Sequence, residues 1–545
     1  MKTIPLCPIP PTASRADAPA GAGRAKRLSP PSHILRFKGS RNHAKPRGFA
    51  ANRLGDWMKF FPVALLALVV AGCTVGPAYR RPPVQADKPL PPAFAEPGPA
   101  GTNETVWKIA EPAASQPRGE WWRMFQDGEL NQLEILAATN NQNLAAAAAQ
   151  FAQARALATA ARAHFYPMIT AGGTPAGDIS RSRTSTDAPQ SGHAAGQSYT
   201  YDTFTAPLFL GWEPDLWGRI RNQSAAARAQ YAAAADDLAS AQLDLAAEIA
   251  ADYFTLRALD NEHGILVDTI ATYRRSLELV KNRRLGGVVT DLDVAQAATQ
   301  LHSAEAQLPA IELQRAQLQD ALALLCGQPP MMFNLATNTL AGVAFPVVPP
   351  TLPGALLEHR PDIAAAERRM AAANANVGVA KSAFFPSIKI NGLAGFQSVD
   401  AGSLFSWANR FWAVGPTLNF PLFTAGLNRA ELESARAAYN ETVANYRQTV
   451  LAAFTEVQDA LYAQSLLATQ WQAENAALQS SQQALAIANN RYNAGLVIYL
   501  DVATAQSDTL THENTVANLG GQRLVATINL IKALGSGWEP VVPPR

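Results

Sequence analysis

Two long stretches of this chain carry apolar residues at alternating spacings of three and four, the pattern of helices that pack side by side along their length. Each stretch, at about 218–284 and about 427–492, would reach about 100 Å at about 1.5 Å per residue. No single globular core is that deep, so we expect long helical hairpins in coiled-coil contact. The seam positions are Leu266, Ile270, Tyr273, Leu277 and Val280 in the first stretch, and Leu432, Ala435, Tyr439, Thr442, Tyr446 and Val450 in the second.

Four shorter runs, rich in aromatic residues, Thr and Gly, have the weak two-residue alternation of strands. They lie at about 166–182, 198–214, 386–399 and 411–424, and a helical pattern at about 129–164 precedes the first. The third run places Ile388, Ile390, Ala394 and Phe396 opposite Lys389, Asn391 and Gln397, and the fourth places Trp412, Val414, Leu418, Phe420 and Leu422 on one side. One apolar face and one polar face suit the wall of a membrane barrel.

The order of these elements occurs twice. From Gly218 against Gly426 onward, residues correspond at a constant offset of 208, so that the stretch 283–293 matches 491–501. Both stretches are Gly-centred breaks between helical patterns. A constant offset over so long a distance indicates an internal repeat. We expect two repeats, at 118–327 and 361–538, joined by a linker at 328–360.

The start of the chain has the composition of a segment that is removed or mis-assigned. Residues 1–57 contain eleven Lys or Arg, eight Pro and no helical or strand period, so we expect disorder there and a true start at Met58. Residues 58–72 combine a positive start with a short apolar run, which is typical of a secretion signal. Its end, Leu68-Val-Val-Ala-Gly-Cys73, resembles a bacterial lipobox. We therefore expect an acylated Cys73, held in lipid by about 0.8 kcal/mol per buried CH₂, a Pro-rich tether over 73–117, and a tail at 539–545.

Charge and cysteine content narrow the class of protein. The formal charge is +2, but the bases and acids of 1–57 together with Lys59 contribute +10, so the remainder carries about −8. A nucleic-acid-binding protein is therefore not expected. Of the three cysteines, Cys7 and Cys73 lie in or next to the leader, and Cys326 has no partner for a disulfide.

Catalytic chemistry has no support in the sequence. The eight His are scattered without H-E-x-x-H or paired-Cys spacing, and no glycine-rich phosphate loop is present. We therefore expect no enzyme activity, no cofactor and no metal site.

Four strands per chain cannot close a barrel, and an open sheet edge in a bilayer would leave backbone groups unsatisfied. Chains must therefore pool their strands. Two chains would give eight strands, a barrel filled by its own side chains, whereas three chains give twelve and leave a lumen. We expect a homotrimer.

The chain from Met58 to about Trp538 resembles the TolC-like outer-membrane efflux factors, in their NodT-type lipoprotein branch. The motifs that carry the resemblance are Gly72-Cys73-Thr-Val-Gly-Pro-Ala-Tyr, Trp121-Trp122, Trp212-Glu213-Pro-Asp215-Leu-Trp-Gly218-Arg219, Arg360-Pro361-Asp362-Ile363, Phe385-Pro386 and the twin Gly-centred breaks. The resemblance implies a mostly α-helical fold with a β-barrel part. In a homotrimer, helical hairpins would form a periplasmic α-barrel, and four transmembrane strands per chain would close a 12-stranded barrel in the outer membrane.

The implied function is the passive exit duct of a tripartite efflux pump for drugs or other small toxic compounds. The implied partners are a periplasmic adaptor and an inner-membrane pump of the RND type. Two alternatives stay open: a duct for type I protein secretion, and a secreted coiled-coil scaffold without a pore. The pump selects the cargo, so this chain does not specify the substrate.

The twin breaks are the predicted closed end of the duct. The resemblance places aperture-lining acids at Asp501 and Asp293, with Arg491 and Tyr492 near enough to bond; the alternative is that Asp501 only favours a helix N-terminus. Gly287 and Gly495 would allow tight turns. These turns would expose the apolar residues Val288, Val289, Leu496 and Val497 to an adaptor's hairpins.

Overall fold

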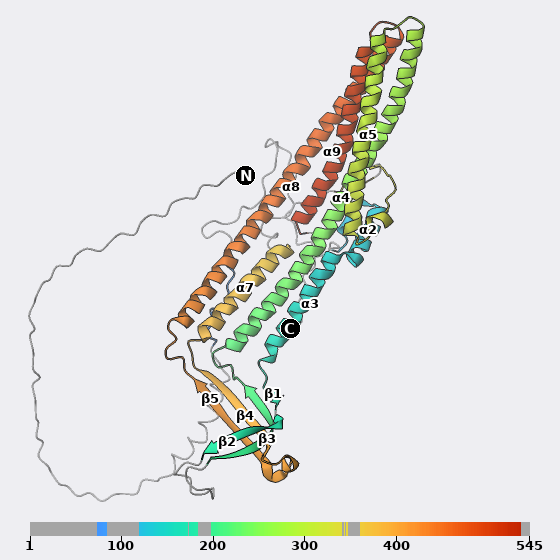
Figure 1. The fold of residues 1–545 in the computed structure, drawn as a ribbon. Coiled ribbons are helices and arrows are strands. Elements are labelled where there is room, and N and C mark those ends of the chain that lie inside the picture. Colours follow the sequence, from blue (N-terminus) through green and yellow to red (C-terminus); the bar gives the residue numbers. More distant parts are fainter. Residues whose placement is uncertain are drawn as a thin grey trace, which may run out of the picture. The chain divides into compact units, whose positions relative to one another are not determined.

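A computed structural model describes residues 74–83, 119–172, 174–183, 198–340, 343, 345–346 and 360–535 of the 545-residue chain. The predicted extension 1–57, the signal 58–72, Cys73 and the tail 539–545 lie outside the described residues, as do residues 84–118. The described part is mostly helical and contains one antiparallel sheet (Figure 1).

Four long helices form the two predicted hairpins. In the first, α4 (Arg219–Leu285) is followed by α5 (Asp291–Leu325), and in the second, α8 (Leu427–Asn493) is followed by α9 (Tyr499–Ala533). Because α4 packs on α5 and α9, and α9 packs on α8, the helices follow one another in the order α5, α4, α9, α8. The seam of the first hairpin is buried, as expected, at Leu266, Ile270, Tyr273, Leu277 and Val280.

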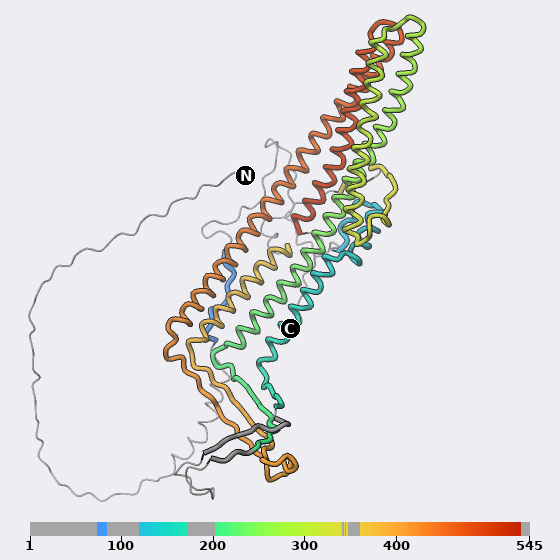
Figure 2. Tube along the Cα trace, viewed as in Figure 1, coloured from blue at the N-terminus to red at the C-terminus, as the bar shows by residue number. Residues whose placement is uncertain are grey.

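Two shorter helices continue this packing beside the strand-proximal half of α4. Helix α3 (Gln142–Ala163) lies against α4, and α7 (Pro361–Ser382) lies between α4 and α8 (Figure 2). The strands and the turn into α5 lie at opposite ends of α4. Helix α4 begins seven residues after the last residue of a strand and ends at the turn into α5, so strands and turns are separated by its 67 residues.

The prediction of one continuous helix at about 129–164 was wrong. The structure has α2 (Gly128–Asn140) and α3, separated at Asn141, whose backbone is extended with φ −64° and ψ 124°. The Asn141 side chain accepts a hydrogen bond from the Leu144 N–H and donates one to the Leu325 carbonyl, both within 2.9 Å. An Asn that caps the following helix while it satisfies a helix end elsewhere interrupts the helix at that position.

The sheet contains β1 (Met168–Ala171), β2 (Thr174–Arg183), β3 (Ser198–Trp212), β4 (Ser387–Ser398) and β5 (Arg410–Asn419). All pairs are antiparallel. Both β1 and β2 pair with β3, β3 pairs with β4, and β4 pairs with β5. The β3–β4 pair joins the two halves of the sequence into one sheet.

Two strand boundaries differ from the predicted runs. The first run is interrupted, and the register against β3 shifts between Thr174 and Asp178; Pro175 in this interval has no N–H to donate to a ladder. β1 and β2 therefore occupy a single strand position, and the sheet has four positions. The fourth run ends at Asn419 rather than near residue 424, because Pro421 cannot continue the ladder.

Short 3₁₀ turns and two buried clusters complete the fold. The turns are η1 (Trp121–Phe125), η2 (Pro330–Met332), η3 (Ala401–Ser403) and η4 (Trp407–Asn409). One apolar cluster joins η1 and α2 to α4, α7, α8 and α9. A second fills the hairpins near their turns, around Leu266, Tyr273, Tyr492 and Tyr499.

Candidate functional site

The sheet has one apolar face and one more polar face. Register pairs Leu208 with Ala394 and Ala394 with Trp412, and residues paired across strands point to the same face. On that face Ile169, Leu208, Trp412 and Val414 are more than half exposed. On the other face the Asn391 side chain donates a hydrogen bond to the Thr417 hydroxyl. The alternation predicted for the third run, and for Trp412, Val414 and Leu418 of the fourth, is confirmed, whereas Phe420 and Leu422 lie beyond the last residue of β5.

Both edges of this sheet are open. Among the described strands, β5 pairs only with β4, while β1 and β2 pair only with β3. The edge strands therefore present unpaired backbone N–H and C=O groups beside exposed apolar side chains. In a hydrocarbon environment such groups cost several kcal/mol each unless they find a partner.

The segment 74–83 lies extended along the helices next to the sheet (Figure 2). The Val75 N–H donates to the Trp217 carbonyl, 3.2 Å away, in the connection between β3 and α4. At Gly218, the N-cap residue of α4 with φ +82°, an added Cβ would lie 2.9 Å from the Thr74 side chain. The start of the predicted tether is therefore docked at the junction of strands and helices.

Further along, this segment is held by side chains of the second repeat. The Asn374 amide donates to the Pro77 carbonyl at 3.0 Å. Arg81 donates to the Tyr446 hydroxyl at 3.0 Å and pairs with Glu367 at 3.4 Å. Because these contacts reach α7 and α8, the segment joins helices of the second repeat to the α4 junction.

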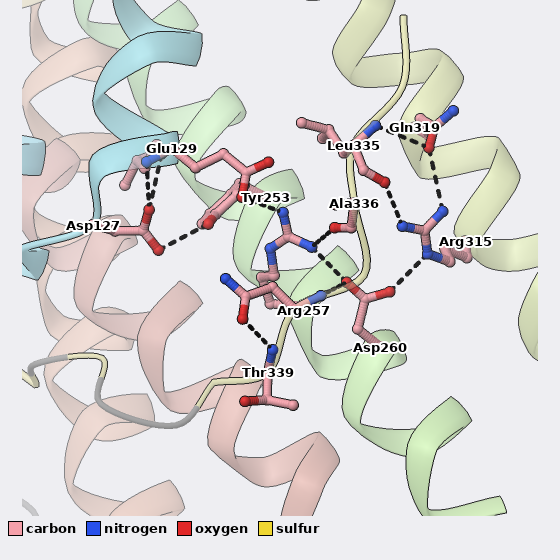
Figure 3. Close-up of polar contacts among 12 residues, drawn as sticks. Asp127, Glu129, Tyr253, Arg257, Asp260, Arg315, Gln319, Leu335, Ala336 and Thr339 are labelled. Carbon is pink, nitrogen blue, oxygen red and sulfur yellow. Dashed lines mark hydrogen bonds and ion pairs between the residues drawn. The ribbon is translucent and has the colours of Figure 1, made fainter. Parts of the chain in front are cut away.

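A buried network connects the first repeat to the linker (Figure 3). The Arg257 side chain is 1% exposed and pairs with Asp260 and with Glu129, the latter at 2.8 Å. It also donates to the Ala336 carbonyl at 2.7 Å, and Arg315 of α5 pairs with the other Asp260 oxygen at 2.7 Å. A buried charge that lost such a partner would cost about 3–5 kcal/mol, so this network fixes where the linker crosses α4 and α5.

A groove of about 940 Å³ lies on the opposite face of α4. The α4 residues that line it include Thr255, Ala258 and Glu262. At 3.6 residues per turn, these positions lie on a different side of the helix from Arg257 and Asp260. Helix α9 approaches closely here: a Cβ at Gly521 would lie 2.6 Å from the Ala258 Cβ. Burial raises the pKa of Glu262. Acids and amides from α4, α5, α8 and α9 line the groove: Glu262, Gln314, Gln317, Glu456, Asp459, Asn518, Gln522 and Asn529.

The two hairpin turns have the same hydrogen-bond pattern. In the first, the Val288 N–H donates to the Arg283 carbonyl, and in the second the Leu496 N–H donates to the Arg491 carbonyl. Gly287 and Gly495 have φ of +73° and +72°, respectively. A left-handed residue with this long-range bond is a Schellman motif, which satisfies the last carbonyls of a helix. The predicted tight glycine turns are present at both positions.

The turns expose apolar side chains, though not all of the predicted ones. Val288 is 73% exposed and Leu496 is 69% exposed. Val289 and Val497 are half-buried instead, because they pack on the second apolar cluster. The sequence reasoning missed Leu285, Leu292, Ile498 and Leu500, which are exposed around the same turns.

The predicted gate residues are not joined to one another within the described part of the chain. Asp293 accepts hydrogen bonds from the Thr290 N–H and hydroxyl, both at 2.8 Å, and so caps α5. Asp501 is exposed in the first turn of α9, and Arg491 is exposed at the end of α8. Within the described part of the chain their side chains do not bond to each other, and both are exposed where another chain could meet them.

Tyr492 is buried rather than exposed at an aperture. Its ring packs edge-on against Tyr499, and the Arg283 guanidinium stacks over it at 4.6 Å. Arg283 also donates to the Tyr492 carbonyl at 3.3 Å and to the Asn493 side chain at 3.2 Å. Arg283 of the first hairpin thus links the two turns.

No group of three His, Cys, Asp or Glu side chains in the described residues is placed to hold a metal ion. None of the described helices combines the length and the apolar character that a membrane-crossing helix requires.

The sequence matches a family model for outer membrane efflux proteins in two segments, residues 135–328 and 352–536, which together span more than half of the chain. The chain belongs to the outer membrane efflux protein family. The toluene efflux pump outer membrane protein TtgF of Pseudomonas putida is 34% identical to it over 481 residues. The alignment covers 87% of this chain and 96% of the relative.

Two further similarities agree with this membership. The cation efflux system protein CusC of Escherichia coli is 31% identical over 477 residues, covering 87% of this chain and 98% of the relative. The MtrE outer membrane channel of Neisseria gonorrhoeae, solved in its open state, superposes with a TM-score of 0.72 at 28% identity, covering 85% of this chain and 98% of that one. This member of the family is an outer-membrane efflux duct with a helical body.

Proposed function

We propose that three copies of this chain close their sheets into one barrel of twelve strand positions and conduct small toxic compounds passively across the outer membrane. The observation that carries the proposal is the sheet with two open edges and one exposed apolar face. Pairing β5 of one copy with β1 and β2 of the next would satisfy both edges. The helices of the three copies then continue the barrel as a periplasmic tunnel.

Within this assembly the groove on α4, α5, α8 and α9 faces the lumen. The linker crosses α4 on the opposite side, at Arg257 and Asp260, and so lies outside the tunnel. Acids and amides along the groove keep the inner wall hydrated. The duct has no catalytic role, and its two repeats, 118–327 and 361–538, each contribute one hairpin to the wall, with 328–360 as the linker.

The hairpin turns close the tunnel and receive the periplasmic adaptor of an inner-membrane pump, of the RND type. Exposed side chains at both turns, including Val288 and Leu496, offer apolar contacts to adaptor hairpins. Asp501 and Arg491, which are exposed and unjoined in one chain, face neighbouring chains at the aperture. The relatives' names include toluene and cation efflux systems, so the cargo is set by the pump.

Cys73 is the proposed lipid anchor of the mature chain. It lies outside the described residues, but Thr74, its neighbour in sequence, is docked against Gly218 where strands give way to helices. That position suits an acyl chain at the membrane surface. Cys73→Ser should abolish palmitate labelling and mature-length processing in cells; unchanged labelling would rule out the anchor.

The duct proposal is tested by conductance of the purified full-length protein in planar lipid bilayers. A duct gives discrete, reproducible single-channel steps, which a coiled-coil scaffold without a pore does not. Complete absence of channels from protein that is folded and membrane-inserted would refute it. A duct for type I secretion would also conduct, and the alternative is decided by whether deletion of the chain abolishes drug resistance or protein export.

A further inference from the structure

A cavity of about 510 Å³ lies between η1, α2, α3 and α4, apart from the groove assigned to the lumen. On α4 it is lined by residues that include Ala239 and Ala246. Ala239 and Ala246 lie on the same side of α4 as Tyr253, Arg257 and Asp260 of the buried network. These five positions follow one another at spacings of seven, seven, four and three residues, which keeps them on one face of a helix. The cavity therefore lies on the linker side of α4, opposite to the groove. Its volume is within the range of small-molecule sites, about 300–1,000 Å³.

Apart from Glu134 and the amide of Gln242, the walls of this cavity are apolar and aromatic. Trp121 is 4% exposed and Trp122 is half-buried, with ring centroids 5.9 Å apart in an edge-on arrangement. Leucines and alanines of α3 and α4 form most of the remaining wall, among them Leu144, Leu238 and Leu243. Indole rings present π faces that attract cations as well as apolar groups.

One acid stands in this apolar wall. Glu134 of α2 lines the cavity and is 3% exposed, and its Oε1 is buried without a hydrogen-bond partner. No Lys or Arg is among the residues that line the cavity in the described part of the chain. An unpaired buried acceptor costs about 1–3 kcal/mol, which a ligand that donates hydrogen bonds would offset.

We propose that this cavity binds a compact organic cation, a guanidinium or ammonium group on an aromatic or branched alkyl body. The charged group donates to the Glu134 carboxylate, and the body packs between the tryptophans and the leucines of α3 and α4. A cation fits better than a neutral ligand because it supplies donors to the orphaned oxygen and is attracted by the indole faces.

Binding of such a cation is coupled to loss of a proton. Burial raises the pKa of Glu134 to about 9, so the empty site holds a neutral acid at pH 7. Among the described residues, Cys326 at the end of α5 is a titratable group that interacts with Glu134, and burial and Glu134 raise the pKa of its thiol to about 11. A permanently charged ligand must therefore displace the Glu134 proton to solvent, and its affinity rises up to about tenfold per pH unit until the acid is ionised.

The test uses benzylguanidinium, which stays charged, and benzylurea, its neutral counterpart, in calorimetric titrations of the full-length protein in detergent between pH 7 and pH 9. Benzylguanidinium should bind more tightly as pH rises and release close to one proton, whereas benzylurea should show neither effect. Glu134→Gln should remove the pH dependence and weaken benzylguanidinium by at least about tenfold. The matched control is Glu431→Gln, at an exposed acid of α8, which should bind as the wild type does.

A second variant keeps the test valid if Glu134→Gln fails to fold. Ala138→Trp places a large side chain at the exposed rim of the cavity without altering a buried residue, and it should reduce binding of both probes. Equal affinity for the charged and neutral probes, affinity that does not change with pH, or binding that survives both Glu134→Gln and Ala138→Trp would each overturn the proposal.

Discussion

Single residues in this duct often serve the fold where the sequence suggested a role in gating. Asp293 caps α5 through Thr290, and Tyr492 is buried beneath Arg283. The spacing along the chain could place Asp293 and Tyr492 at a turn. It could not distinguish an acid that caps a helix from an acid that lines an aperture, because both kinds of acid are favoured at the start of a helix. Asp501 and Arg491 remain exposed, and for them the gate stays a prediction.

The gate prediction follows from three copies of Asp501 around the tunnel axis. Asp501→Ala should raise resting conductance and weaken selectivity for cations, because a ring of carboxylates favours cations and can bond to neighbouring chains. The double variant with Asp293→Ala should have a larger effect, partly through loss of the α5 cap. Single-channel recordings of the double variant that match the wild type in both properties would exclude these aspartates from the gate.

A second prediction at this scale concerns Glu134. Its folded pKa of about 9 lies above the usual 4.5, so its contribution to stability is fully present below pH 4.5 and is lost as pH rises toward 9. At pH 7 the cost is roughly 3 kcal/mol. Thermal unfolding should therefore show stability falling between pH 7 and 9, and Glu134→Gln should flatten this slope.

The range above pH 7 separates Glu134 from Asp236 and Asp252. Burial also raises the pKa of Asp236 and of Asp252, each to about 6, so both are largely ionised by pH 7. Asp252→Asn is the matched control and should leave the slope between pH 7 and 9 unchanged. A wild-type protein whose stability does not fall over this range would contradict the burial of a neutral Glu134.

At the scale of elements, the ends of α4 and α8 were predicted to within about one residue, because their apolar period extends over many turns and glycines mark both ends. The interruption at Asn141 was not predictable, since its cause is a bond to the Leu325 carbonyl, far away in sequence. The short strands were located, but their ends were not predicted. Pro175 and Pro421 interrupt pairing with strands that cannot be identified from the sequence alone. The burial of Glu134 was likewise not predictable, because the sequence does not distinguish it from an exposed acid on a helix.

The turns carry the element-scale prediction. Gly287→Ala and Gly495→Ala should each destabilise the protein by about 1–2 kcal/mol, because an L-residue is strained at positive φ. Nothing lies within 4 Å of the added Cβ at either site, so the cost is that of the backbone alone. Gly264→Ala, at an exposed and equally open position inside α4, should instead stabilise by up to about 1 kcal/mol. Thermal unfolding followed by circular dichroism compares the three, and an unchanged Gly495→Ala would contradict the left-handed turn.

On the scale of the whole molecule, the internal repeat organises the chain. The β3–β4 pair places one strand from each half in the middle of the sheet, while Arg283 fastens the two turns at the other end of the hairpins. Both repeats therefore end in surfaces that a single chain does not cover: two strand edges at one end and two exposed turns at the other. These uncovered surfaces are the ones that the proposed assembly with further copies would cover.

The native mass of the detergent-extracted protein tests this account most directly. Four strand positions with open edges require pooling, and a lumen requires more than eight strands, so the account predicts a particle of three chains. The same preparation should form channels in a planar bilayer. A stable monomer or dimer that still conducts would contradict the claim that three sheets close one barrel.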